Sequence, residues 1–264
     1  MGALAMKNLR DMAARIGKVL ICSAVYDSKV HLAYHTSMVT TLVMFERMGV
    51  KWDQWHWEGD FHVERSVNGM LSRFLNSDFD QVLFIDTDEA WKAHDVARIL
   101  SHTEEVVGGS YRMKNAFNEY VGAIKREDGQ PIGKMLPDGT ALLAAERVAG
   151  GFLKTRKSAL EKLVPTCDWY YWTDRQTGIT EKHYAFFWNE VRNNEFFGMD
   201  YVYCERLKKA GVELWIDPVP KIAHFGTKRW EGDFDKYLRD AGKTEEAFSI
   251  VKEMANGDRN IQGN

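Results

Sequence analysis

The sequence predicts an α/β protein with a mostly parallel, twisted sheet and helices on both faces, and three observations support this fold class. Strand-like and helix-like segments alternate from residue 18 to about residue 113. The segments 18–26 and 81–85 are almost continuously apolar, which is typical of parallel strands buried on both faces. The chain has 264 residues and is 45% hydrophobic, which is enough for a large core.

In chain order, the first half begins with the strand at 18–26. Apolar residues at helical spacing then predict a helix over 32–48, which Gly49 ends. The order β-α-β-α-β-α-β predicts an open, doubly wound sheet, in which ligands bind outside the carboxyl ends of the strands. Its remaining segments are a strand (51–58), a helix (62–77), a strand (81–88), a helix (93–102) and a strand (104–113).

The second half is less regular. Asp128-Gly129 predicts the turn of a hairpin, and Gly150-Gly151 interrupts a strand that runs into a helix. The segment 167–191 is aromatic without a clear period. A helix over 198–211 precedes one last strand or a pair of strands, broken by Pro218 and Pro220.

Composition and charge limit the function classes. A net charge of −3 gives no global basic field for nucleic acid or an anionic membrane, although a local basic groove stays open. The three cysteines are far apart and odd in number, which favours free thiols in a reducing compartment. Residues 1–18 lack the uninterrupted apolar run of a signal peptide or membrane span. We therefore expect a soluble, cytoplasmic protein; its oligomeric state is not predicted.

The stretch QVLFIDTDEAW at 81–91 places Asp86 and Asp88 at the end of an apolar strand. Residues two apart on an extended backbone project to the same face, so both carboxylates can converge on one point. A divalent cation would remove their mutual repulsion, and oxygen ligands suit Mn²⁺ or Mg²⁺. Solvated turn aspartates are the alternative, and the D-x-D patterns at 78–80 and 233–235 are read that way.

Two enzyme classes use a D-x-D after an apolar strand. In phosphotransferases of the haloacid-dehalogenase type, the motif lies near the start of the domain, with Thr or Val two residues after its second Asp. Here that position is Ala90, and about 85 residues precede the motif. The other class holds a nucleoside diphosphate sugar through a metal and expects a nucleotide-binding half before the motif, as in this chain.

The motifs and their order resemble the GT-A fold glycosyltransferases, in particular a GT2-like bacterial and phage subgroup, over most of residues 18–226. Besides the D-x-D, the resemblance rests on VVGGSYRMK (106–114), VAGGFLKTRKSALEKL (148–163) and FGMDYVYCERLKKAGVELWIDPVPKIAHFG (197–226). It implies a Rossmann-like, mostly parallel sheet with a smaller mixed sheet on the acceptor side. It also implies metal-dependent transfer of a sugar to an acceptor hydroxyl from a nucleoside-diphosphate donor, with a UDP-sugar favoured over a GDP-sugar.

The resemblance further implies one domain over 1–264. Within it, about 18–113 would bind the nucleotide sugar, about 114–230 would bind the acceptor and carry the catalytic residue, and 231–264 would form a C-terminal helical tail.

The resemblance assigns the metal to three residues. Asp88 would bind Mn²⁺ or Mg²⁺ directly, Asp86 would face the ribose or the metal and its water, and His224 would return to the site as a third ligand. Taken alone, His224 would be read as a structural histidine. The donor-binding residues implied by position are Asp27, Arg65, Asp86, Lys114, Lys228 and Arg229. A turn aspartate and a solvated helix arginine are the alternatives for Asp27 and Arg65.

Asp200 matches the general base of inverting members. The family pattern has Glu-Asp before an aromatic-x-Phe-Cys helix, whereas this chain has Met199 before Asp200 and Tyr203 in place of Phe. A retaining mechanism without such a base, and a helix-capping role for Asp200, are the alternatives. Gly150 and Gly151 suit a backbone that lies close to the sugar or acceptor.

On the acceptor side, Trp169 and Trp172 belong to an aromatic segment whose rings can stack on sugars or bases. Phage members of the subgroup glycosylate hydroxymethylated pyrimidines, so hydroxymethylated DNA in a host cytoplasm is one candidate acceptor. A glycan, a lipid-linked sugar and a protein side chain are the others, and a degenerate domain that binds without catalysis is a further alternative. Residues that can form a local basic groove are Lys154, Arg156, Lys157, Lys162, Arg175, Lys182 and Arg192.

Overall fold

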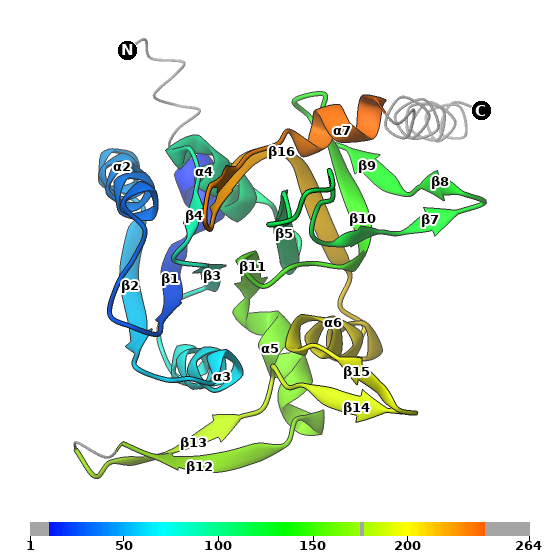
Figure 1. Ribbon diagram of the computed structural model, residues 1–264. Coiled ribbons are helices and arrows are strands. Elements are labelled where there is room, and N and C mark those ends of the chain that lie inside the picture. Colours follow the sequence, from blue (N-terminus) through cyan, green and yellow to red (C-terminus); the bar gives the residue numbers. More distant parts are fainter. Residues whose placement is uncertain (1–10, 175–176, 241–264) are drawn as a thin grey trace, which may run out of the picture.

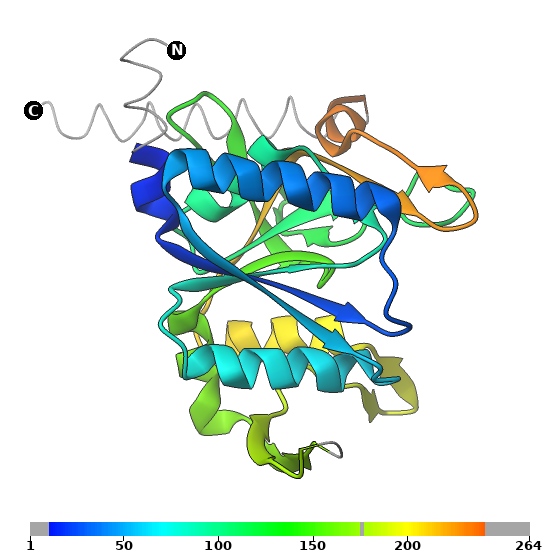
Figure 2. The same ribbon diagram turned by 90° about the vertical axis from the view of Figure 1, so that its left-hand side faces the viewer.

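The structure, a computed structural model, describes residues 11–174 and 177–240. It confirms the predicted α/β class, because one large twisted sheet lies between two layers of helices (Figures 1 and 2). Arg175 and the part of the predicted C-terminal tail beyond residue 240 lie outside the described residues.

The first half alternates strands and helices as predicted. The left-handed conformation of Gly49, with φ of 73°, ends the first long helix at the predicted position. The elements are β1 (Lys18–Val25), α2 (Leu32–Met48), β2 (Lys51–Glu58), α3 (Val63–Leu75), β3 (Gln81–Ile85), β4 (Glu89–Ala90), α4 (Ala93–Ser101) and β5 (Val106–Tyr111).

The second half contains shorter strands. The predicted hairpin turn is confirmed, since Asp128 and Gly129 both have positive φ and join two antiparallel strands. The strands are β6 (Ala123–Ile124), β7 (Arg126–Glu127), β8 (Gln130–Pro131), β9 (Gly133–Met135), β10 (Ala141–Arg147), β11 (Phe152–Arg156), β12 (Trp169–Thr173), β13 (Thr180–Tyr184), β14 (Glu190–Arg192), β15 (Glu195–Phe197), β16 (Leu214–Phe225) and β17 (Arg229–Trp230). The helices are α5 (Lys157–Leu163), η1 (Val164–Thr166), α6 (Met199–Lys209) and α7 (Phe234–Asp240).

The central sheet has the strand order β2-β1-β3-β11-β5-β16-β10-β6. The pairs β1–β2, β1–β3 and β5–β16 are parallel, whereas β11 runs antiparallel between β3 and β5. The carboxyl end of β3 therefore lies beside the Gly150-Gly151 turn that leads into β11. This arrangement brings residues from both halves of the chain to one edge of the sheet.

The helices cover the two faces of the sheet and create two apolar cores. Helices α2 and α4 lie on one face, and α3, α5 and α6 lie on the other (Figures 1 and 2). Phe45 and Leu100 are fully buried in the first core, and Phe74 and Leu160 are fully buried in the second. The strands between them are apolar on both sides for this reason.

Two sequence predictions need correction. The strand predicted over 81–88 ends at Ile85, so Asp86 and Asp88 lie in a turn rather than on an extended backbone. The turn forms because the Asp86 amide still donates to the Gly151 carbonyl (2.9 Å), while the Glu89 amide donates back to the Asp86 carbonyl (3.2 Å). Pro218 and Pro220 do not divide the last strand; β16 is continuous and only its register against β5 shifts.

Candidate active site

The turn after β3 places Asp86 and Asp88 in different surroundings. Asp86 is exposed to solvent, and the Asp88 side chain is 40% exposed. Even so, the protein atoms packed around the Asp86 carboxylate, followed by the negative charges of Asp88 and Asp200, raise the pKa of Asp86 to about 6. Burial also opposes ionisation of Asp88, but the nearby His224 and Lys114 outweigh it and lower the pKa of Asp88.

His224 is brought to this turn by strand pairing. In the β4–β16 ladder, His224 lies opposite Glu89, and the Phe225 amide donates to the Asp88 carbonyl (2.8 Å). As a result, His224 Nε2 lies 3.6 Å from Asp88 Oδ1. The other ring nitrogen, Nδ1, lies 3.2 Å from the Arg112 carbonyl. A carbonyl only accepts, so Nδ1 is the donor in this bond, and Nε2 is left directed toward Asp88.

These residues fit a divalent cation, although they do not form a complete site as they stand. Within residues 11–174 and 177–240, no group of three or more His, Cys, Asp or Glu side chains is arranged to hold a metal. However, a carboxylate oxygen and an imidazole nitrogen 3.6 Å apart can share one ion, and the His224–Arg112 contact fixes the ring in the ligating tautomer. The other Asp88 oxygen, Oδ2, contacts the Lys114 ammonium, so the positive charge of this lysine already faces the carboxylate.

Glu89 and Tyr111 lie beside these residues, and the sequence analysis did not identify either one as part of the site. Glu89 is fully buried, and neither of its carboxyl oxygens has a hydrogen-bond partner of good geometry among the described residues. Burial, followed by the charge of Asp86, raises the pKa of Glu89 well above its ordinary value, and the Tyr111 phenol interacts with it. The available signal was its place directly after the D-x-D, in DTDEAW.

The two glycines make room for these carboxylates. A Cβ on Gly151 would lie 2.5 Å from Asp86 Oδ2 and 2.8 Å from Glu89 Oε1, and a Cβ on Gly150 would lie 2.7 Å from Asp200 Oδ1. The backbone at both glycines therefore lies close to side chains of the site; its approach to a sugar or acceptor stays a prediction.

Asp200 lies in the first turn of α6 with only one of its oxygens engaged. Its Oδ2 accepts a hydrogen bond from the Gly150 amide (3.1 Å), whereas Oδ1 is buried without a partner among the described residues. Burial raises the pKa of Asp200. The N-cap position of α6 is Gly198, and no side chain caps this helix, so Asp200 does not act as the cap.

Asp200 separates two cavities. The first, of about 360 Å³, is lined by Asp86, Asp88, Gly150, Gly151 and Asp200 together with residues of β1, β3 and α3. The second, of about 660 Å³, lies between residues 111–122, the end of β10 and the start of α6. Tyr111, Met199 and Asp200 line both cavities, so the Asp200 carboxylate can reach a molecule in either one.

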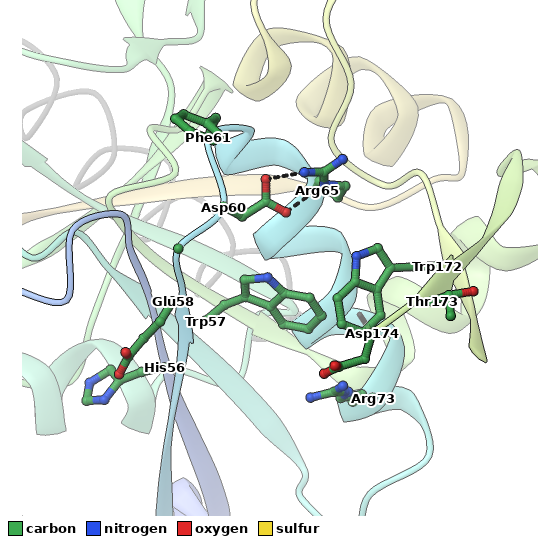
Figure 3. A pocket seen from close by; sticks show the side chains of 11 residues that line it. His56, Trp57, Glu58, Asp60, Phe61, Arg65, Arg73, Trp172, Thr173 and Asp174 are labelled. Atoms are coloured by element: carbon green, nitrogen blue, oxygen red, sulfur yellow. Dashed lines mark hydrogen bonds and ion pairs between the residues drawn. The ribbon is translucent and has the colours of Figure 1, made fainter. Parts of the chain in front are cut away.

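Other predicted site residues lie outside the first cavity. Asp27 is exposed and pairs with Lys29 (3.2 Å), and Arg65 pairs with Asp60 (2.6 Å) in a third cavity, shown in Figure 3. On the β16–β17 hairpin, Lys228 lies over the ring of Trp230 and Arg229 pairs with Glu231 (2.7 Å).

The two acceptor-side tryptophans also separate. Trp172 lines the third cavity, whereas Trp169 is half exposed and does not. Successive side chains of a strand point to opposite faces, and residues three apart on β12 therefore diverge. One aromatic surface containing both rings is not formed.

Comparisons with known proteins add little evidence about the function of this chain. No protein-family model matches the sequence, and no curated protein does. Among solved structures, the chain is similar to the crystal structure of GalNAc-T7 with UDP, GalNAc and Mn²⁺, with 10% identity and a TM-score of 0.45. The match covers 84% of this chain and 48% of that chain, so this chain spans about half the length of that neighbour. The similarity is too distant to assign a shared activity.

A search of the helices among the described residues finds none that is both long and apolar enough to cross a membrane.

Proposed function

We propose that this protein is a metal-dependent glycosyltransferase of the GT-A type, which moves a sugar from a nucleoside-diphosphate donor to an acceptor hydroxyl. One observation carries the proposal: Asp86, Asp88 and Asp200 line a single cavity at the carboxyl ends of the strands, with His224 Nε2 facing Asp88 from β16. The motif resemblance over 18–226 supports the same reading.

Asp88 and His224 would hold Mn²⁺ or Mg²⁺, and Asp86 lines the same cavity as Asp88. When bound, the metal neutralises the diphosphate that leaves. Lys114 is placed to contact the same diphosphate, because its ammonium already lies at the Asp88 carboxylate. Lys228 and Arg229 occupy the neighbouring hairpin, and Asp27 follows β1 at the same edge of the sheet. A UDP-sugar is the first donor to test.

Asp200 would act as the general base. As the acceptor oxygen bonds to the anomeric carbon, the bond from that carbon to the diphosphate oxygen breaks and the acceptor proton moves to Asp200 Oδ1. The Gly150 amide holds Oδ2 and so orients the carboxylate. A pKa raised by burial makes Asp200 a stronger base than an exposed carboxylate. Met199, which replaces the family's Glu, lines the cavity beside it.

The structure lends little support to hydroxymethylated DNA as the acceptor. The sequence predicted that Lys154 belongs to a basic groove for DNA, and this prediction is wrong. Lys154 is fully buried and donates to the His102 carbonyl (3.1 Å). Arg192 is paired with Glu190 and Glu205, and Lys162 is paired with Glu105. Cations that are already neutralised contribute little to phosphate binding.

A donor-hydrolysis assay tests the proposal. We expect the wild-type protein to release nucleoside diphosphate slowly from a UDP- or GDP-sugar in Mn²⁺, and not after EDTA treatment. Asp88→Asn should lose this release. If no donor in the panel is cleaved while Mn²⁺-dependent nucleotide binding is present, the chain is a binding domain without catalysis.

A further inference from the structure

The third cavity, of about 750 Å³, lies between the end of β2, the helix α3 and the hairpin β12–β13. Figure 3 shows the Trp57 and Trp172 indoles at its centre, with Arg65 and Asp60 at one end and Arg73 at the other. It is larger than the cavity at Asp86, and α3 separates the two. Val63 and Val67 of α3 line the first cavity, whereas Arg65 and Arg73 line the third from the opposite face of the helix.

A glycine on α3 leaves the space that the Trp57 ring occupies. Gly69 lies on α3 between Arg65 and Arg73, and a Cβ there would be 2.6 Å from the Trp57 ring. Its absence lets Trp57 pack directly on the helix. Trp172 meets Trp57 edge to face, with 4.9 Å between ring centroids, and His183 stacks on one face of Trp172 at 5.5 Å. Trp172 still lines the cavity, so part of its ring surface can meet a ligand.

Both arginines that line the cavity are paired with carboxylates. Arg65 donates twice to Asp60, at 2.6 Å in both contacts, and Asp60 has only 6% of its side chain exposed. Arg73 pairs with Glu181 (2.8 Å), and its guanidinium lies 4.8 Å from the centre of the Trp57 ring. Glu58 and Asp174 add two further carboxylates, while burial lowers the pKa of His56. The cavity therefore offers no excess positive charge to a polyanion.

We propose that this cavity is a binding site for a neutral oligosaccharide, separate from the cavity that holds Asp86, Asp88 and Asp200. Each sugar hydroxyl both donates and accepts a hydrogen bond, and the arginine–carboxylate pairs present donors and acceptors side by side. The apolar face of a pyranose ring packs on an indole, as Trp172 allows. A volume of about 750 Å³ is within the range of small-molecule sites and leaves room for more than one sugar unit.

Titration of the intact protein with maltotriose, cellotriose and triacetylchitotriose tests this site, with tryptophan fluorescence and calorimetry as readouts. At least one trisaccharide should bind, and Trp172→Ala should weaken its binding about tenfold. Trp169→Ala is the matched control, because Trp169 lies on the same strand outside the cavity, and it should bind as the wild type does. Since Trp172→Ala can disturb the hairpin, Arg73→Gln is the second variant and should also weaken binding.

Binding at this site needs neither donor nor metal, so Asp88→Asn and Asp200→Asn should leave the trisaccharide affinity unchanged. That independence distinguishes failure here from failure of the proposed transferase. The proposal is overturned if no trisaccharide binds at concentrations up to about 10 mM, or if Trp172→Ala and Arg73→Gln bind normally. Trp172-dependent binding of uridine, guanosine or oligo-dT without any trisaccharide binding would overturn it as well.

Discussion

The Gly150 amide donates a hydrogen bond to Asp200 Oδ2 (3.1 Å) and leaves Oδ1 buried without a partner among the described residues. An unpaired buried carboxylate oxygen costs folding free energy, commonly about 1–3 kcal/mol. The cost is offset if Oδ1 receives a donor from substrate, and the acceptor hydroxyl is that donor in the proposed reaction. The same carboxylate lines both cavities, so in the proposed reaction it can contact a reactant in either one.

Asp200→Asn should keep donor binding and reduce transfer by about 10²-fold or more, the usual scale for a general base. The amide preserves the acceptor oxygen for Gly150 but cannot take up a proton. Steady-state kinetics and a nucleotide-binding titration on the same preparation separate the two effects. Wild-type turnover in this variant would indicate a retaining mechanism or another base.

Gly151→Ala should destabilise the fold by about 1–3 kcal/mol, because the new methyl group overlaps polar atoms that cannot move apart freely. Its Cβ would meet Asp86 Oδ2, Glu89 Oε1 and the Tyr111 hydroxyl at once. Gly198→Ala is the control, since nothing lies within 4 Å of the added Cβ. This change loses only the advantage that Gly has over Ala at the N-cap of α6. Urea denaturation measures both. Equal stability of the two variants would show that the oxygens around Gly151 rearrange easily.

The stability of the protein should rise between pH 7 and pH 9 through Lys154. Burial lowers the pKa of Lys154 to about 7 from 10.5, so in this range the unfolded chain binds a proton that the folded chain does not. The free energy of unfolding then increases by up to about 1.4 kcal/mol per pH unit. Lys154→Met should remove this increase, whereas Lys162→Met, at an exposed ion pair with Glu105, should keep it. Identical pH slopes for wild type and Lys154→Met would contradict the assignment.

Local patterns in the sequence were sufficient for much of the fold. The apolar run before Asp86, the glycine after α2 and the Asp128-Gly129 turn all specify backbone conformation within a few residues. The position of β11 could not be predicted this way. Its antiparallel insertion between β3 and β5 depends on pairing between segments that are far apart in the chain.

The candidate site shows the same limit. Asp86 and Asp88 stand out because carboxylates follow an apolar strand, but the approach of His224 depends on the register of β16 against the two-residue strand β4. Burial and pairing are equally invisible in the sequence. Lys154 belongs to a cluster of basic residues in the sequence, yet it is fully buried in the structure. Arg65 forms an ion pair with Asp60.

The metal site is the central claim, and calorimetric titration of UDP and GDP in Mn²⁺ tests it most directly. We expect the wild type to bind one of the two nucleotides only when Mn²⁺ is present. Asp88→Asn and His224→Ala should both lose that binding while unfolding cooperatively near the wild-type temperature. Asp78→Asn, in the surface D-x-D that pairs with Lys18, should bind as the wild type does. Unchanged Mn²⁺-dependent affinity in both Asp88→Asn and His224→Ala would contradict the account.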